Sequence, residues 1–342
     1  MTNPPIYLLE TTMPVVQHST YKAPSILYKS AHYATIVPGL YRQYPNYSID
    51  RERLELIDGD FLDLDWRKQR APDRKENNHK LLILSHGLEG SSNRPYITAT
   101  ADYFYQRGYS TLAWNQRGCS GEINRNLCFY HHGVYDDLNA VIEHALAQGY
   151  EAIYLIGFSM GAAVGFNYLG HIHGQQPMLD PRIKGIVGIS TPLDITESAR
   201  FINEGFNRVY VRNFLGTLKT KVREKAIQFP AFPNLDKLDK VRSFTAFDNY
   251  YTAPLHGFKD GADYYHRVSP LRVLSHIKVP ALAINALNDP MLGESCYPYE
   301  TAEKHPYFYL ETPKHGGHCG FPLKGSPYSW AEIRAFEFLN RL

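Results

Sequence analysis

Ser159 lies at the centre of the pentapeptide GFSMG, residues 157–161. The apolar run 152–159 is typical of a strand, and residues 160–171 have the composition of a helix. A serine on such a sharp strand-to-helix turn holds its hydroxyl above the edge of a sheet, and glycines flank it because neighbouring backbone lies close. We therefore predict that Ser159 is a nucleophile; the alternative is a serine that only caps the helix.

A serine hydroxyl is a weak nucleophile at neutral pH, so it needs a general base and a carboxylate that orients the base. Asp289 follows the apolar segment 279–286, and His318 follows the segment 307–311. The order serine, acid, histidine, with each residue on a loop after a strand, is typical of one class of hydrolases. We predict that His318 activates Ser159 and that Asp289 orients His318.

Each of these assignments has a rival. Asp194 follows the fourth alternating strand and is a second candidate for the acid, and His315 is a second candidate for the base. We favour His318 because the two glycines before it let the loop bring it over the nucleophile. A zinc site on His315 and His318 is disfavoured, since neither a helical HExxH motif nor a nearby acidic ligand accompanies them. We predict no metal and no cofactor.

Two backbone N–H groups are candidates for stabilising a negatively charged tetrahedral intermediate. The Met160 N–H lies at the start of the predicted helix, and the Leu88 N–H follows the Ser85-His86-Gly87 turn after the first alternating strand. Donors at these two places form the oxyanion hole of hydrolases that carry the GxSxG turn. For Leu88 the alternative is a plain glycine turn.

Two further motifs have a structural as well as a functional explanation. Arg117, after the second alternating strand, is a candidate for binding a substrate carboxylate, but we expect it to hold the site loops together. His131 and His132 each precede an aspartate by five positions, a spacing that suggests an acyltransferase. Those aspartates, Asp136 and Asp137, also open a predicted helix, where acids interact favourably with the helix dipole. We favour the latter explanation.

The elements that must position these residues alternate along the chain. Residues 53–66 alternate apolar and polar positions on both sides of Asp58-Gly59, which predicts a β-hairpin. Beyond a polar linker (69–80), we expect strands at 80–87, 109–115, 152–159, 183–190, 279–289 and 307–317, and helices at 95–107, 135–148, 160–171 and 330–342. This alternation predicts an α/β fold with a mainly parallel sheet covered by helices on both faces.

The alternation stops between residues 192 and 278, where helical periodicity continues without a clear strand. We predict an irregular N-terminal arm (1–52) packed on one catalytic core (53–191 and 279–342), with a helical cap inserted at 192–278. The core is one domain because Ser159 precedes the insertion while the predicted base and acid follow it. Residues 206–229 carry six basic side chains against one acid. We expect a helix with a solvated basic face there, rather than one lying on a membrane.

The composition of the chain argues against several classes of protein. The 342 residues hold 36 Lys and Arg against 34 Asp and Glu, a net charge of +2, far from the basic excess of nucleic-acid-binding proteins. Four cysteines without a CxxC pair predict free thiols in a reducing compartment. The first residues lack the features of a signal peptide, and we expect no membrane span. We predict a cytoplasmic protein with a small-molecule substrate and no nucleic-acid partner, leaving open its oligomeric state and peripheral lipid contact.

Together these motifs resemble those of the α/β-hydrolase superfamily and, more narrowly, the YheT-like hydrolases related to the yeast medium-chain ethyl ester synthases. The resemblance covers about residues 30–342 and is carried by AHYATI, SHGLEGSSNRPYI, NQRGCSGEINR, FYHHGVYDDL, GFSMGAAVGFNYLG, YYTAPLHGF, DYYHRVSP, NALNDPML and GGHCGF. The family's nucleophile, acid and base match Ser159, Asp289 and His318. The resemblance implies an esterase or acyltransferase acting on short-to-medium acyl chains, with phospholipid cleavage in some members.

We therefore predict a serine hydrolase that cleaves carboxylic esters of short-to-medium acyl chains through an acyl-enzyme intermediate. One alternative is an acyltransferase that passes the acyl group to an alcohol, and another is a phospholipid or lipid esterase. A third is a non-enzymatic binding module, which the presence of all three triad residues disfavours.

Overall fold

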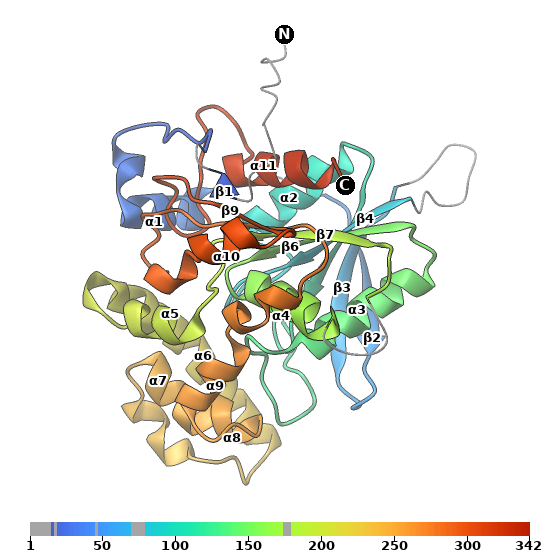
Figure 1. Cartoon of the computed structure of the whole chain (residues 1–342). Helices are drawn as coiled ribbons and strands as arrows, with labels where there is room; N and C mark the ends of the chain where they lie inside the picture. Colours follow the sequence, from blue (N-terminus) through green and yellow to red (C-terminus); the bar gives the residue numbers. More distant parts are fainter. Residues whose placement is uncertain (1–14, 17–18, 45–46, 70–78, 174–178) are drawn as a thin grey trace.

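The computed structural model describes residues 15–16, 19–44, 47–69, 79–173 and 179–342. One nine-stranded sheet in the order β1-β9-β8-β7-β6-β4-β5-β3-β2 crosses the molecule (Figure 1). Only the pairs β2–β3 and β3–β5 are antiparallel. The strands are β1 (Val15–Val16), β2 (Asp50–Glu55), β3 (Phe61–Arg67), β4 (Lys80–Ser85), β5 (Ser110–Asn115), β6 (Ala152–Phe158), β7 (Ile183–Ile189), β8 (Ala281–Ile284) and β9 (Phe308–Glu311).

Helices cover both faces of this sheet, as the alternating pattern predicts. In β4, Leu81 and Ile83 pack toward one helical layer, whereas Leu82 and Leu84 pack toward the other. Because successive side chains of a strand point to opposite faces, a strand buried on both faces is apolar throughout. The first layer contains α3 (Tyr135–Ala147), α4 (Met160–His173) and α10 (Tyr299–Lys304), and the second contains α2 (Pro95–Tyr105) and α11 (Trp330–Leu339). The predicted α/β fold is confirmed.

The predicted hairpin is also present. β2 pairs with β3 from Asp50 opposite Trp66 to Glu55 opposite Phe61, and the turn between them contains Asp58 and Gly59. Gly59 has φ of +80°, a conformation that a side chain disfavours.

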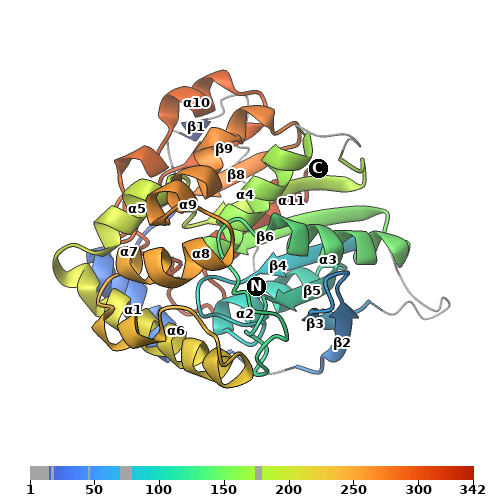
Figure 2. The same cartoon turned by 90° about the horizontal axis from the view of Figure 1, so that it is seen from below.

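Residues 192–278, all of which the structure describes, contain helices and no strand. The helices are α5 (Ile195–Ile202), α6 (Arg208–Gln228), α7 (Phe244–Phe247), α8 (Ala253–Leu255) and α9 (Gly261–Val268). α6 buries Val211, Leu215, Leu218 and Val222, which recur at helical spacing, in an apolar cluster separate from the sheet core. Figure 2 shows these helices gathered at one end of the sheet.

The N-terminal segment is less irregular than predicted, and this is a correction. Residues 31–41 form helix α1 (Ala31–Tyr41), and β1 adds a short parallel strand beside β9. α1 contains Pro38 and only one fully buried residue, Ala34, so it lacks the apolar stripe by which a helix is detected in a sequence. Residues 1–14 and 70–78, which include most of the predicted linker, lie outside the described residues.

Candidate active site

Ser159 occupies the tight turn between β6 and α4. Its φ is +52°, in the left-handed region that side chains rarely adopt. A Cβ at position 157 would lie 2.4 Å from the Ala162 Cα, and one at 161 would lie 2.4 Å from the His86 carbonyl oxygen. Both positions therefore require glycine, as the sequence motif predicts. The turn carries the Ser159 hydroxyl into a cavity at the carboxyl end of the sheet.

His318 and Asp289 meet Ser159 in one hydrogen-bonded relay. The His318 Nε2 lies 2.8 Å from Ser159 Oγ, and its Nδ1 lies 2.9 and 3.0 Å from the two Asp289 carboxylate oxygens. The carboxylate can only accept, so Nδ1 carries the ring proton, and Nε2 of the neutral ring is free to accept the serine proton. Asp289 is itself held by the Met291 N–H at 2.9 Å.

Two effects act in opposite directions on the pKa of His318. Burial alone would lower the pKa of the imidazole, but the adjacent Asp289 carboxylate raises it, and the net pKa lies well above the ordinary histidine value. The Asp289 carboxylate is therefore placed where it favours the protonated form of the His318 ring.

The loop that carries His318 is fixed by the N-terminal helix α1. The His318 N–H donates to Thr35 Oγ1 at 2.9 Å, and the Thr35 hydroxyl donates to the Ala31 carbonyl. A Cβ on Gly317, whose φ is +62°, would lie 2.7 Å from the same Thr35 oxygen. The sequence did not predict this contact, because nothing in residues 30–41 marks Thr35 for a partner 283 positions away.

The peptide group before Leu88 is oriented by a buried histidine. The Gly87 carbonyl accepts from His86 Nδ1 at 2.8 Å and from the Gly90 N–H at 3.0 Å. His86 Nε2 accepts the Gln116 N–H, and burial lowers the pKa of the ring to about 4, so Nδ1 carries the proton of a neutral imidazole. In a trans peptide the next N–H points opposite to this carbonyl.

Leu88 and Met160 line the same cavity as Ser159. Gly87 lies against the nucleophile, since a Cβ there would be 3.3 Å from Ser159 Cβ. The Met160 N–H belongs to the first turn of α4, where backbone N–H groups have no partner within the helix. This arrangement is suited to holding a negative oxygen between two backbone donors.

The loop residue after Leu88 is tied to α6 by a buried ion pair. Glu89 has φ of +53°, its N–H donates to the Tyr130 hydroxyl, and that hydroxyl donates to Glu89 Oε1. Lys221 of α6 places its ammonium group 2.8 Å from the same carboxylate oxygen and 3.3 Å from the Cys119 sulfur. Burial would lower the Lys221 pKa, but Cys119 and Glu89 raise it above its ordinary value. The lysine is therefore charged.

The expectation of a solvated basic face on α6 holds for Arg208, Arg212 and Arg223, which are exposed, but it is wrong for two lysines. Lys221 is largely buried, and Lys225, which donates to the backbone carbonyls of Asn124 and Asn126, is completely buried. Both lie beside Val222 on the packed side of the helix. An apolar stripe interrupted by lysines at 221 and 225 was the signal in the sequence for this inward contact.

A cavity of about 600 Å³ surrounds Ser159 and His318. Its walls are mostly apolar and come from α1, α5, α6, α7 and the loops at the sheet edge; they include Ile36, Pro38, Ile195, Ile202, Tyr210, Phe214, Leu218 and Phe247. Asp248 is an exception. Its carboxylate accepts from the hydroxyls of Thr252 and Tyr265, and burial raises its pKa to about 6.

The rival residues for the acid and the base are placed elsewhere. Asp194 caps α5, accepting the Glu197 N–H at 3.2 Å and the Ser295 hydroxyl at 2.8 Å. His315 is on the same loop as His318, but it forms no hydrogen bond with Ser159 or Asp289 in the part of the chain that the structure describes.

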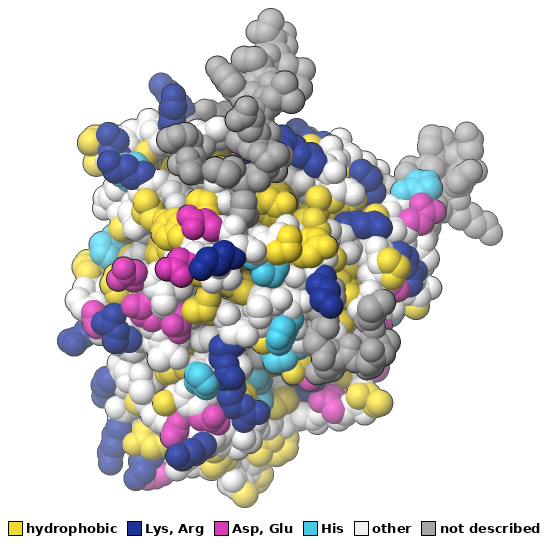
Figure 3. Space-filling model, viewed as in Figure 1, with side chains coloured by type: hydrophobic (Ala, Val, Ile, Leu, Met, Phe, Trp, Pro, Cys, Tyr) yellow, Lys and Arg dark blue, Asp and Glu magenta, His cyan; other side chains and the backbone are white. Residues whose placement is uncertain are grey.

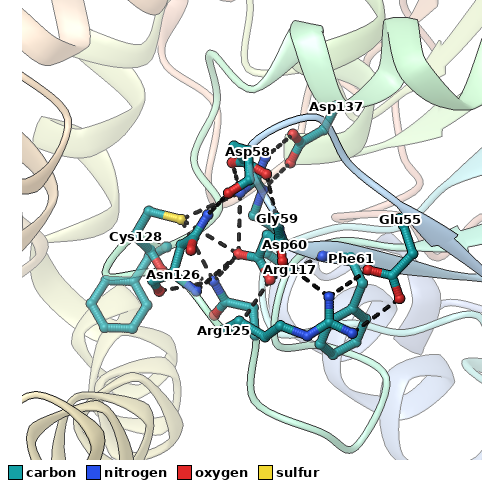
Figure 4. Close-up of polar contacts among 12 residues, drawn as sticks. Glu55, Asp58, Gly59, Asp60, Phe61, Arg117, Arg125, Asn126, Cys128 and Asp137 are labelled. Atoms are coloured by element: carbon teal, nitrogen blue, oxygen red, sulfur yellow. Dashed lines mark hydrogen bonds and ion pairs between the residues drawn. The ribbon is translucent and has the colours of Figure 1, made fainter.

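Arg117 has a structural role, as expected. Its guanidinium makes two hydrogen bonds to Asp137, at 2.7 and 2.8 Å, and also contacts the carboxylates of Asp58 and Asp60 and the sulfur of Cys128 (Figure 4). These contacts join the β2–β3 turn to the start of α3. Arg117 does not line the cavity around Ser159.

The two histidines at 131 and 132 line that cavity but do not pair with the aspartates five positions later. His132 Nδ1 lies 2.8 Å from the Tyr264 hydroxyl, and His131 Nδ1 accepts the Gly133 N–H at 3.0 Å. Asp137 is occupied by Arg117. The spacing therefore does not produce a histidine–aspartate pair.

Comparison with known proteins gives a consistent result. Residues 80–324 match the family model described as the alpha/beta hydrolase fold. The chain is 32% identical over 320 residues to YheT of Escherichia coli (strain K12), a protein named as an esterase by assignment. The match covers 92% of this chain and 91% of YheT. It is 27% identical to the medium-chain fatty acid ethyl ester synthase/esterase 2 of Saccharomyces cerevisiae, over 78% of this chain and 63% of that one. The structure of the Pyrococcus furiosus esterase Pf2001 superimposes with a TM-score of 0.57 at 17% identity, covering 88% of this chain and 95% of that one.

Proposed function

The chain belongs to the α/β-hydrolase fold family, and on this premise we propose that it is a serine esterase. Ser159 is the nucleophile, His318 the general base and acid, and Asp289 the carboxylate that orients the base. The observation that carries the proposal is the relay of hydrogen bonds from Ser159 Oγ through the His318 ring to Asp289, at 2.8 and 2.9 Å. Such a relay on a GxSxG turn is the arrangement by which serine hydrolases activate a hydroxyl.

The acylation step follows from this geometry. Ser159 Oγ bonds to the ester carbonyl carbon while its proton moves to His318 Nε2, and the carbonyl oxygen becomes an oxyanion facing the Leu88 and Met160 N–H groups. The bond from carbon to the alcohol oxygen then breaks, and His318 returns the proton to the leaving alcohol.

Deacylation repeats the same steps with water. Water gives one proton to His318 Nε2 as its oxygen bonds to the acyl carbon, and the Ser159 oxygen leaves and regains that proton from His318. The carboxylic acid is released, and the enzyme returns to its starting state.

The cavity suggests the substrate class. A volume of about 600 Å³ with mostly apolar walls is suited to an acyl chain of short to medium length. The walls come from the arm helix α1 and from α5–α7, in keeping with our proposal that residues 1–52 and 192–278 are an arm and a cap on one catalytic core. The name of the Saccharomyces relative, an ethyl ester synthase/esterase, refers to the same chemistry.

A fluorophosphonate probe tests the nucleophile directly. We expect stoichiometric labelling of the folded wild-type protein at Ser159 and no labelling of Ser159→Ala. A series of p-nitrophenyl esters from acetyl to palmitoyl then defines the acyl preference. Folded protein that neither labels at Ser159 nor hydrolyses any ester of the series would overturn the proposal.

Acyl transfer to an alcohol is the second candidate, favoured by the name of the Saccharomyces relative. It uses the same acyl-enzyme, with an alcohol in place of water in the second half. Formation of ethyl ester from p-nitrophenyl butyrate with added ethanol, measured against release of butyrate, decides between them. An ester yield above that expected from the ethanol-to-water ratio identifies a transferase.

A further inference from the structure

The cavity that holds Ser159 opens between α1 and α6, and its edge is apolar and solvent-exposed. Tyr41 at the end of α1, and Phe206 and Val209 at the start of α6, are each more than half exposed, as is Leu40. The His32 ring of α1 lies 4.4 Å from the Phe206 ring and its Nδ1 lies 2.9 Å from the Tyr210 hydroxyl, which places the two helices side by side. We call these four apolar residues, together with Arg208 and Arg212, the mouth rim.

Exposed apolar side chains flank the cavity on two helices: Leu40 and Tyr41 end α1, and Phe206 and Val209 stand at the start of α6. Scattered exposed apolar residues are normal on a protein surface, but exposed apolar residues that border a cavity are features of an interaction site. Leu40 and Val209 also line the cavity, so the exposed group continues into its apolar wall. A molecule that covers the rim therefore also covers the entrance to Ser159.

Two unpaired positive charges stand beside the rim. Residues 19–44 contain Lys22, Lys29 and Arg42 and no acid, and exposed Glu204, two positions before Phe206, is paired with Arg200. Arg42 is paired with Glu332, but exposed Arg208 and Arg212 form no ion pair with any residue that the structure describes. On the face drawn in Figure 3, Lys and Arg are interspersed with Asp and Glu.

We propose that the mouth rim is a docking surface for an anionic lipid bilayer. Apolar and tyrosine side chains that enter the headgroup region, flanked by arginines that attract anionic lipids, are the features of a protein that binds a membrane surface peripherally. No helix among the described residues is long and apolar enough to cross a bilayer, so the contact is with one leaflet. A second copy of this chain is a poorer occupant, because two rims of the same positive sign repel each other.

Membrane docking would bring an ester substrate to the cavity, and only this part of the proposal rests on the proposed function. A chain that leaves the bilayer at the rim passes Leu40 and Val209 into the cavity without crossing water. The binding surface itself does not depend on the triad. Ser159→Ala therefore separates the two proposals: it must bind vesicles as the wild type does, even if no ester is found to be hydrolysed.

Vesicle flotation at low salt tests the surface, with phosphatidylcholine vesicles compared with vesicles that also contain phosphatidylglycerol. We expect binding only to the anionic vesicles. Arg208→Glu with Arg212→Glu should weaken it at least twentyfold, at about fivefold for each basic residue removed. Tyr41→Asp with Phe206→Asp should weaken it at least tenfold at constant charge on the arginines. None of these four residues lines the cavity, so hydrolysis of p-nitrophenyl acetate in solution should be unchanged.

Two matched controls exclude general effects of charge and of lost apolar surface. Ile57→Asp removes a fully exposed isoleucine from the β2–β3 turn, and Arg341→Glu reverses an exposed charge at the end of the chain. Both should bind as the wild type does. No binding to anionic vesicles, or equal loss in rim and control variants, would overturn the proposal. So would a dimer in sedimentation equilibrium that the rim variants abolish, because the rim would then be covered by a second copy.

Discussion

Two polar networks lie on loops that follow strands of the same sheet. They differ in the partners that hold the side-chain nitrogens at their centres. Around Arg117, after β5, each guanidinium nitrogen has a carboxylate partner, and one also contacts a sulfur. Around His318, after β9, the imidazole holds a carboxylate at Nδ1 but only a serine hydroxyl at Nε2. In the first network a carboxylate holds every guanidinium nitrogen, whereas in the second the Nε2 of His318 faces a hydroxyl whose proton it can accept.

The difference shows that position at the carboxyl edge of a sheet does not make a residue catalytic. Arg117 and His318 have equally favourable positions in the sequence, yet Arg117 joins a hairpin to a helix (Figure 4) and does not line the cavity around Ser159. A catalytic side chain at this edge needs an atom that no charged partner holds, and it must line a cavity that can admit the reactant. Substitutions in the first network should therefore change stability, and those in the second should change turnover.

Ser159→Ala should have the largest effect. Removing the hydroxyl leaves no nucleophile, and kcat should fall by roughly four to six orders of magnitude. The strained turn and its backbone hydrogen bonds remain, so the free energy of unfolding should change little. Ester hydrolysis and urea unfolding of the same preparation check both parts; a large loss of stability would place Ser159 among the structural residues.

Asp289→Asn should lower kcat by about three to four orders of magnitude, because the amide no longer stabilises the imidazolium or fixes the ring tautomer. The pH profile gives a second measurement. His318 works as a base only when neutral, and its pKa is raised in the wild type, so activity should be lost as pH falls through a value above that of an ordinary histidine.

In Asp289→Asn the carboxylate that raises the pKa is gone while burial remains, so the acid limb of kcat/KM should move to lower pH. A limb that stays in place would show that another group controls it. The Asp194→Asn variant is the matched control, because Asp194 caps α5 and does not touch His318. Its pH profile should be that of the wild type.

Arg117→Met should act on stability. It leaves the buried Asp60 and Asp137 without their cation, and breaking a buried ion pair in this way costs about 3–5 kcal/mol of unfolding free energy. Turnover per folded molecule should stay within about twofold. Arg223→Met removes an exposed pair with Asp239, of the kind worth less than about 1 kcal/mol, and serves as the control. Equal destabilisation by the two variants would contradict the comparison.

Lys221→Met should have the smallest effect. Lys221 belongs to neither network, but its ion pair with Glu89 supports the loop that carries Leu88. The loss removes the cationic partner of Glu89, the residue after Leu88, and a displaced Leu88 N–H should lower kcat about tenfold with little change in KM. Lys219→Met is the control, since Lys219 donates to the Val241 carbonyl and forms no ion pair with Glu89 among the described residues. Adding Glu89→Gln to Lys221→Met should recover part of kcat; no recovery would show that the lysine acts only through packing.

The sheet, and the positions of Ser159, Asp289 and His318 after its strands, could be predicted from the sequence because both depend on local patterns. Apolar runs set β4 to β9, and the loop after each strand is found by counting, which brings Ser159, Asp289 and His318 to one edge. Helix α1 could not be found in this way, since it carries a proline and no apolar stripe. Its Thr35 contact depends on the three-dimensional path of the chain.

The inward lysines show a second limit. A basic residue on an amphipathic helix is expected to be solvated, and most of those on α6 are. Lys221 and Lys225 are buried because carboxylate or carbonyl oxygens from distant loops meet them. Whether such a partner exists depends on how the cap sits on the core, which composition does not reveal.

The contact between Thr35 and His318 also bears on the order in which the protein can assemble. It joins residues 283 positions apart, and the Arg42–Glu332 ion pair joins residues 290 apart. Synthesis proceeds from the N-terminus, and contacts of such long sequence separation form late in folding. Helix α1 leaves the ribosome before β2 to β9, yet it is among the last of the described elements to dock, and the loop carrying His318 acquires its full support only after Glu332 has been made.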